Sequence, residues 1–110
     1  MDENNSIIEQ AKRIIVEESR SINNLSNYLD DNFANVVKEI LATKGRLVIT
    51  GIGKSALIAN KIVATMNSTG TPALFMHAAE AIHGDLGMIQ KDDIVLCISK
   101  SGNTPEIKVL

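Results

Sequence analysis

The residues best suited to chemistry begin with a short turn, residues 51–55, whose sequence is GIGKS. An apolar run over residues 47–50 ends at this turn, and helical spacing of apolar residues follows it. A strand–turn–helix junction exposes unpaired backbone N–H groups and the partial positive charge of the helix N-terminus. Glycine lets a ligand approach the backbone closely, and Lys54 adds a positive charge. These residues predict an anion site, most simply for phosphate.

A second junction of this kind lies in residues 99–106, SKSGNTPE. The hydroxyls of Ser99, Ser101 and Thr104 surround a glycine, and Thr104 followed by proline is typical of a helix start. Hydroxyls and unpaired N–H groups together form a neutral phosphate cradle. The alternative, that Thr104 only caps its helix and the serines only turn the chain, is compatible with phosphate binding. Glu106 lies in the first helical turn, where it complements the helix dipole or faces the site.

Both histidines of the chain, His77 and His83, fall in residues 77–87 together with Glu80 and Asp85. A lone histidine is more often structural than catalytic, but this grouping favours a functional role. Two histidines separated by five residues are not a strong metal signature.

The elements that must position these groups follow from the spacing of apolar residues. We expect helices within residues 7–41 with a break at 19–21, strands over 47–50, 73–76 and 94–98, a helix over 55–68, and a short mixed segment over 77–87. Continuously apolar strands that alternate with helices predict a three-layer α/β/α fold with a parallel sheet covered on both faces. Ligands bind beyond the carboxyl ends of such strands, where all three polar clusters fall.

Residues 1–44 are therefore expected to form a helical lead-in, and residues 45–110 the N-terminal half of an α/β domain. A three-stranded half-sheet leaves apolar surface and a strand edge uncovered. We expect further chain or another copy of this chain to cover them.

The composition is that of an ordinary globular domain: 110 residues, 45% hydrophobic and 22% charged, with a net charge of −2. An acidic chain is a poor match for nucleic acid or an acidic membrane surface, so neither is an expected partner. The single cysteine, Cys97, excludes a disulfide within the chain and suits a reducing compartment. No apolar run reaches the roughly 18 residues of a membrane span. A cytoplasmic location is expected.

Two known phosphate-binding motifs are alternative interpretations of the turn at residues 51–55. A Walker A loop needs a glycine five residues before Gly53, and Val48 stands there. A dinucleotide fingerprint is formally met by Gly51, Gly53 and Ala56, but it expects an acidic residue at the end of the second strand, where His77 stands.

Taken together, residues 51–55, 68–72, 80–88 and 99–106 resemble the sugar isomerase (SIS) domain of bacterial arabinose-5-phosphate isomerases. The resemblance covers residues 44–110, and its most specific part is the HGDLGM run at 83–88. It implies a flavodoxin-like SIS fold and interconversion of D-ribulose 5-phosphate and D-arabinose 5-phosphate, which supplies synthesis of Kdo, the acidic sugar of lipopolysaccharide. It also implies a homotetramer and no required cofactor.

The resemblance further implies roles for particular residues. Lys54, His83 and Glu106 match catalytically relevant positions. The positions that match substrate-binding residues are Gly53, Ser55, Gly70, Thr71, His77, Ser99, Ser101, Gly102, Asn103 and Thr104. The His77 position can take an inhibitory zinc ion.

The isomerisation moves a proton between two carbons through an enediol, so it needs a base and a group that supports the oxyanion. We expect Glu106 or His83 to transfer protons and Lys54 to support the enediolate or the phosphate. The family also uses a second glutamate and another histidine further along, and often appends CBS modules. We therefore expect this sequence to be a short form of the family that has no CBS modules and is truncated within the catalytic domain.

The competing function is a non-catalytic SIS module that senses phosphosugars, as in some transcriptional regulators. Residues 1–44 contain no basic recognition helix, which counts against that alternative.

Overall fold

The structure is a computed structural model that describes residues 2–82 and 84–100. The chain divides into two compact units, residues 1–38 and 39–110. The division falls inside helix α2 (Asp31–Ala42).

The first unit is helical, and polar caps set where its helices begin. Helix α1 (Glu3–Asn24) starts at Asp2, whose carboxylate accepts the Asn5 N–H at 2.7 Å. A 3₁₀ turn over Leu25–Tyr28 follows it. The Asp30 carboxylate then accepts the N–H of Asn32 at 3.0 Å and starts α2.

The predicted helix break at residues 19–21 is wrong, because α1 continues without interruption to Asn24. The interruption lies at residues 25–30, where the 3₁₀ turn, an extended Leu29 and the cap at Asp30 intervene. The slip of the apolar stripe near residue 20 therefore marks a change of helix face within one helix.

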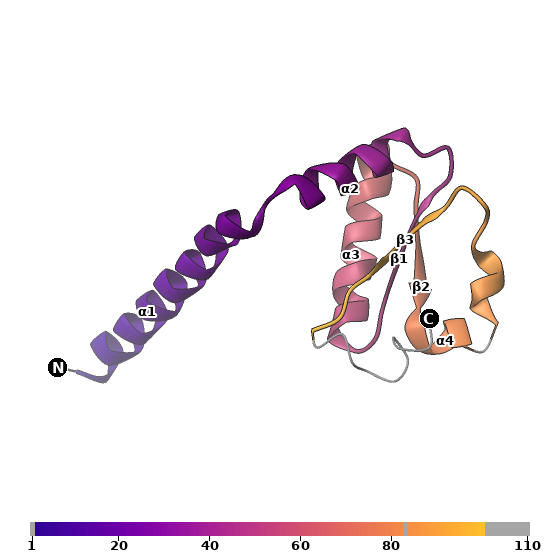
Figure 1. Cartoon of the computed structure of the whole chain (residues 1–110). Coiled ribbons are helices and arrows are strands. Elements are labelled where there is room, and N and C mark those ends of the chain that lie inside the picture. Colours follow the sequence, from indigo (N-terminus) through magenta and orange to yellow (C-terminus); the bar gives the residue numbers. More distant parts are fainter. Residues whose placement is uncertain (1, 83, 101–110) are drawn as a thin grey trace. The chain divides into compact units, whose positions relative to one another are not determined.

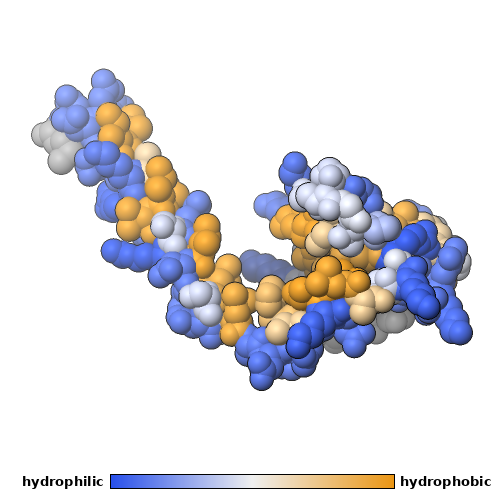
Figure 2. Space-filling view, turned by 90° about the horizontal axis from the view of Figure 1, so that it is seen from above, coloured by the Kyte–Doolittle hydropathy of each residue, from blue (hydrophilic) through white to orange (hydrophobic). Residues whose placement is uncertain are grey.

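Every described residue of the first unit is exposed. Hydrophobic residues nevertheless run along α1 and the turn after it (Figure 2). The most exposed of them include Ile7, Ile8, Ile14, Ile15, Val16, Ile22, Leu25 and Tyr28. Within the described part of the chain, no helix combines the length and apolarity needed to cross a membrane.

The second unit is built on a three-stranded parallel sheet in the order β2-β1-β3 (Figure 1). Its strands are β1 (Leu47–Gly51), β2 (Ala73–His77) and β3 (Ile94–Cys97). The register pairs the first residue of β1 with the first residue of each neighbouring strand. All three strands agree with the predicted ranges to within one residue.

Helices cover both faces of this sheet, which confirms the predicted α/β/α layers. Leu47 and Ile49 of β1 pack on one face against Ala59 of helix α3 (Lys54–Ser68). Val48 packs on the other face in a cluster with Ala81 of helix α4 (Ala78–Ile82). Residues 47–50 of the central strand are at most 1% exposed.

Strand β3 is far less covered than β1. Val95 and Leu96 are 41% and 36% exposed, and Cys97 is also exposed. β3 is also an edge of the three-stranded sheet. The expected uncovered apolar surface and strand edge are therefore present in the described part of the sheet.

A polar network ties together the two loops that feed β1 and β3 at the amino edge of the sheet. Asp93, whose side chain is 1% exposed, forms an ion pair with Arg46 at 2.9 Å. The Asp93 carboxylate also accepts the backbone N–H groups of Arg46 and Gln90, each at 2.8 Å. The hydrogen bond from the Arg46 side chain, followed by these two backbone bonds, holds the pKa of Asp93 well below its usual range.

The two loops also approach each other closely at Gly45. A Cβ atom placed on Gly45 would lie 2.3 Å from the backbone carbonyl group of Asp92. The Thr43 hydroxyl donates to that same carbonyl oxygen and accepts the Gly45 N–H at 3.2 Å. Because the obstacle is backbone, no rotation of a side chain can relieve it.

We expect Gly45→Ala to lower the free energy of unfolding by about 1–3 kcal/mol, the usual cost of overpacking. Gly87→Ala is the matched control, because a Cβ atom there meets nothing within 4 Å. It should change stability by less than about 0.5 kcal/mol. Urea unfolding measures both, and equal midpoints for the two variants would contradict the close approach at Gly45.

Because the pKa of Asp93 is lowered in the folded state, the free energy of unfolding should fall as the pH falls. Between its folded pKa and its unfolded pKa of about 4, the folded state binds fewer protons than the unfolded state, so stability falls as the pH falls. The stability advantage of wild type over Asp93→Asn should be complete above about pH 5 and shrink progressively below about pH 4. Unfolding midpoints from pH 7 to pH 2 measure this difference. The control is Asp92→Asn, which alters the exposed carboxylate next door and should keep the wild-type acid dependence.

Candidate functional site at the carboxyl edge of the sheet

The turn that follows β1 depends on glycine at two positions. A Cβ atom on Gly51 would lie 3.0 Å from the backbone of Ser55, so glycine lets the turn pack tightly on the start of α3. Gly53 has φ 62° and ψ −130°, a conformation that residues with a side chain rarely adopt. These two residues bring the chain from the buried strand directly into the helix.

Helix α3 begins at this turn without a side-chain cap. Gly53 is its N-cap residue and can offer only backbone, and its carbonyl oxygen accepts the Ala56 N–H at 3.1 Å. The first N–H groups of a helix have no partner within the helix, and the end carries partial positive charge. Lys54 is exposed and Ser55 is half-buried at this end. The predicted anion-binding features therefore occur together in one helix terminus.

His77 lies beside this turn, because Gly51 pairs with His77 in the register of β1 and β2. Its ring is half-buried and stands edge-on to Phe75, with 6.1 Å between the ring centroids. Nδ1 accepts the backbone N–H of Ala79 at 3.2 Å, so the neutral ring carries its proton on Nε2. His77 therefore offers a hydrogen-bond donor at Nε2.

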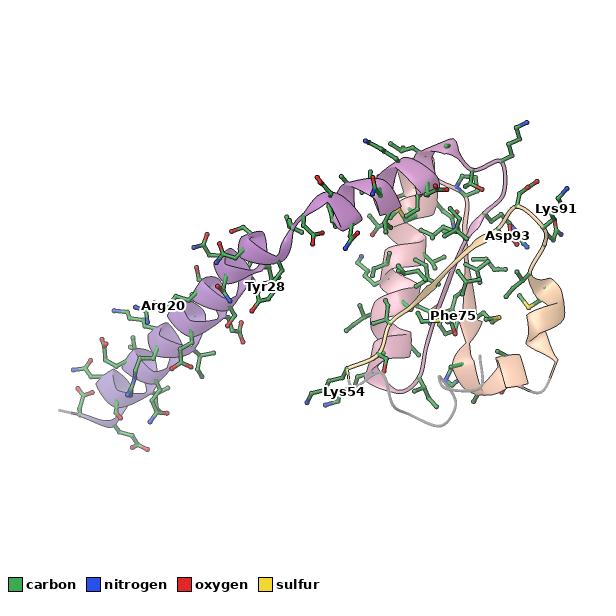
Figure 3. The ribbon with its side chains drawn as sticks, viewed as in Figure 1. Arg20, Tyr28, Lys54, Phe75, Lys91 and Asp93 are labelled. Carbon is green, nitrogen blue, oxygen red and sulfur yellow. The ribbon has the colours of Figure 1, made fainter. Side chains whose placement is uncertain are left out.

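Ser99 reaches the same edge from β3. The Ile98 N–H donates to the Thr50 carbonyl at 2.9 Å, which continues the pairing of β1 with the chain beyond Cys97. The half-buried Ser99 follows directly. Figure 3 shows Lys54 at this end of the unit and Asp93 with Lys91 at the opposite end.

The structure thus gathers Gly53, Lys54, Ser55, His77 and Ser99 at one edge, as the parallel topology predicts. Six further residues predicted for this site lie outside the described residues. They are His83, Ser101, Gly102, Asn103, Thr104 and Glu106.

Gly70 and Thr71 are not brought to this edge. They follow α3 and precede β2, and the neighbouring Pro72 carbonyl accepts the N–H of Leu47 at the start of β1. With about 3.3 Å per strand residue, five residues place them roughly 15 Å from the turn at Gly53. They line a separate cavity of about 180 Å³, together with Ile40, Leu41, Thr43, Gly45, Leu47 and Pro72.

The described residues do not form a zinc site around His77. No group of three or more His, Cys, Asp or Glu side chains that could hold a metal occurs among them. Zinc at Nε2 would need the ring proton on Nδ1, and that nitrogen instead accepts the Ala79 N–H. Zinc inhibition through His77 remains a prediction, and no chemical step depends on it.

Sequence reasoning did not single out Arg46 and Asp93, the strongest polar pair in the described structure. They are 47 residues apart and belong to no periodic pattern or motif. Only the pairing of β1 with β3 brings them together, so no local signal could have found them.

A parallel sheet with a glycine turn, a helix N-terminus and a lysine at its carboxyl edge defines an α/β domain of the phosphate-binding class. The SIS domain family matches residues 40–110 of this chain. The chain belongs to the SIS domain family.

Several relatives are similar over nearly the whole chain. The arabinose 5-phosphate isomerase KdsD of Pseudomonas aeruginosa is 47% identical over 110 residues, which are 100% of this chain and 34% of the relative. The arabinose 5-phosphate isomerase GutQ of Escherichia coli K12 is 42% identical over 105 residues, 96% of this chain and 33% of the relative.

A solved structure of an Escherichia coli CFT073 protein in complex with arabinose 5-phosphate superimposes with a TM-score of 0.90 and 41% identity. The superposition covers 99% of this chain and 57% of the solved chain. The present chain therefore spans about a third of the two curated relatives and little more than half of that solved structure.

Proposed function

We propose that this chain is the substrate-binding part of an aldose–ketose isomerase that interconverts D-ribulose 5-phosphate and D-arabinose 5-phosphate. The observation that carries the proposal is the likeness of nearly the whole chain to a protein solved with arabinose 5-phosphate. The names of the curated relatives support the same reaction. We further propose that it works in the cytoplasm and that its product feeds synthesis of Kdo.

The carboxyl edge supplies groups that this reaction needs. The helix N-terminus at Gly53 and the hydroxyls of Ser55 and Ser99 suit a phosphate group. Lys54 is exposed at the same helix end, where its charge can support an enediolate oxygen or the phosphate. Glu106 or His83 would move the proton between the two carbons.

The reaction is best tested on this chain and on a chimera in which it replaces the matching third of the Pseudomonas relative. The chimera should form arabinose 5-phosphate from ribulose 5-phosphate. Absence of turnover in a folded chimera would reject the isomerase. Binding of arabinose 5-phosphate without turnover would favour the alternative, a phosphosugar sensor.

Within an active chimera, we expect Lys54→Met to lower kcat/KM by about 100-fold, because it removes charge where the oxyanion develops. Glu106→Gln should lower kcat by about 100-fold or more if Glu106 is the base. Lys61→Met, which removes another exposed lysine of the same helix, is the matched control and should stay within about twofold of wild type. A Lys54→Met variant that behaves like Lys61→Met would exclude Lys54 from the reaction.

We also propose that the chain forms a homo-oligomer, with a tetramer as the expected state. The exposed apolar side chains of α1 support association, because a helix with such a stripe is stable when the stripe is covered. Because Gly70 and Thr71 lie at the other edge of their own sheet, we propose that a second copy supplies the substrate contacts that the family resemblance assigns to these positions.

We expect Ile15→Gln to shift the assembly toward smaller species, because Ile15 is 67% exposed on α1. Sedimentation velocity over a range of concentrations measures the shift. Glu18→Gln, at an exposed polar position of the same helix, should leave the assembly unchanged. Identical profiles for the two variants would rule out the α1 stripe as an interface.

A further inference from the structure

The chain makes one long excursion between β2 and β3. It leaves the carboxyl edge after His77, forms α4 and a 3₁₀ turn over Asp85–Met88, and returns to the amino edge at Ile94. We call residues 78–93 the excursion. It carries Glu80 and Asp85, and the sequence position of His83 lies between α4 and the 3₁₀ turn.

Apolar contacts hold the excursion against the sheet at only a few described positions. Ala81 and Ile89 pack on Val48 and Met76. Gly84 donates to Ala81 and Gly87 donates to Gly84, so these hydrogen bonds stay within the excursion. They shape the segment but do not fix it relative to β1.

Arg46, the residue directly before β1, links the excursion to that strand. Its Nη2 atom donates to the Met88 carbonyl at 2.7 Å, at the end of the 3₁₀ turn. Among hydrogen bonds between described residues, this is the one that joins residues 84–89 to a residue outside the excursion. The same Nη2 atom lies 2.9 Å from Oδ2 of Asp93.

Asp93 holds the guanidinium in place for this contact. Its Oδ1 atom accepts two hydrogen bonds from Arg46. One comes from the backbone N–H at 2.8 Å and the other from the side-chain Nε–H at 3.4 Å. Its Oδ2 atom also accepts the Gln90 N–H at 2.8 Å. The ion pair is largely shielded from water on the carboxylate side, since the Asp93 side chain is 1% and the Arg46 side chain 34% exposed. A planar guanidinium that meets two acceptors at once constrains direction as well as distance.

We propose that Arg46 and Asp93 are positioning residues of the candidate site. Through the Met88 carbonyl they hold the excursion in register with β1, the strand that also ends in the Gly51 turn. Neither residue touches the site, which lies at the opposite edge of the sheet. The catalytic consequence rests on the proposed isomerase function, whereas the mechanical link does not.

The mechanical link is tested by amide hydrogen exchange on the chain itself. In Arg46→Met, the amides of Gly87 and Met88 should exchange at least about 10-fold faster, while Ile49 and Thr50 in β1 stay protected. Lys44→Met, which removes a lysine from the same loop, should change neither. Arg46→Lys keeps the charge but not the planar fork, so it should restore protection only in part. Unchanged exchange at Gly87 and Met88 in folded Arg46→Met would overturn the proposal, even if its melting temperature falls.

The catalytic consequence is tested in the chimera, below the melting temperature of every variant. Arg46→Met should lower kcat by about 10-fold and change KM by less than about twofold, because misplaced groups slow the chemical step. In an Asp93→Asn background the same substitution should cost less than about twofold, since the guanidinium of Arg46 is then no longer held against the Met88 carbonyl. If the two substitutions lower kcat by independent factors that multiply in the double variant, the positioning role is overturned. A wild-type chimera without turnover would reject the proposed function, and the exchange experiment would still decide the mechanical link.

Discussion

The second unit depends on the burial of strand β1 from both sides. Residues 47–50 are at most 1% exposed, and burial of each Leu, Val or Ile side chain contributes about 1.5–3 kcal/mol. An exposed pair such as Lys12 and Glu9, 3.6 Å apart, contributes at most about 1 kcal/mol. Because β1 pairs in parallel with both β2 and β3, its central position also determines which loops meet at each edge of the sheet.

The parallel direction of the three strands separates the two edges by chemistry. The carboxyl edge has the turn at Gly53, the start of α3, His77 and Ser99, which are suited to an anionic ligand. The amino edge has a network centred on Arg46 and Asp93, which satisfies its own charges internally. A division between a reactive edge and a structural edge is general for parallel α/β sheets, since helix N-termini gather beyond the carboxyl ends of the strands.

In the first unit, the spacing of apolar residues predicted the helices but not where the first of them ends. Its apolar spacing predicted helices correctly, but it placed the break at residues 19–21 and not at 25–30. A slip in an apolar stripe changes the face that a helix presents, whereas a break needs residues that satisfy the free backbone groups, as Asp30 does. Capping chemistry was therefore the better signal for the helix boundary.

The sequence by itself determined the α/β/α layers, the three strands and the gathering of Lys54, Ser55, His77 and Ser99 at one edge, because strand and helix periods are local and parallel topology follows from their alternation. The same topology puts Gly70 and Thr71, which precede a strand, at the other edge, although the family resemblance assigns them to the substrate. Only the tertiary structure decided that Arg46 joins Asp93 and Met88. Family motifs assign residues to a ligand without saying which chain or edge supplies them. Contacts between residues more than 40 positions apart arise from strand pairing, and no local pattern encodes them.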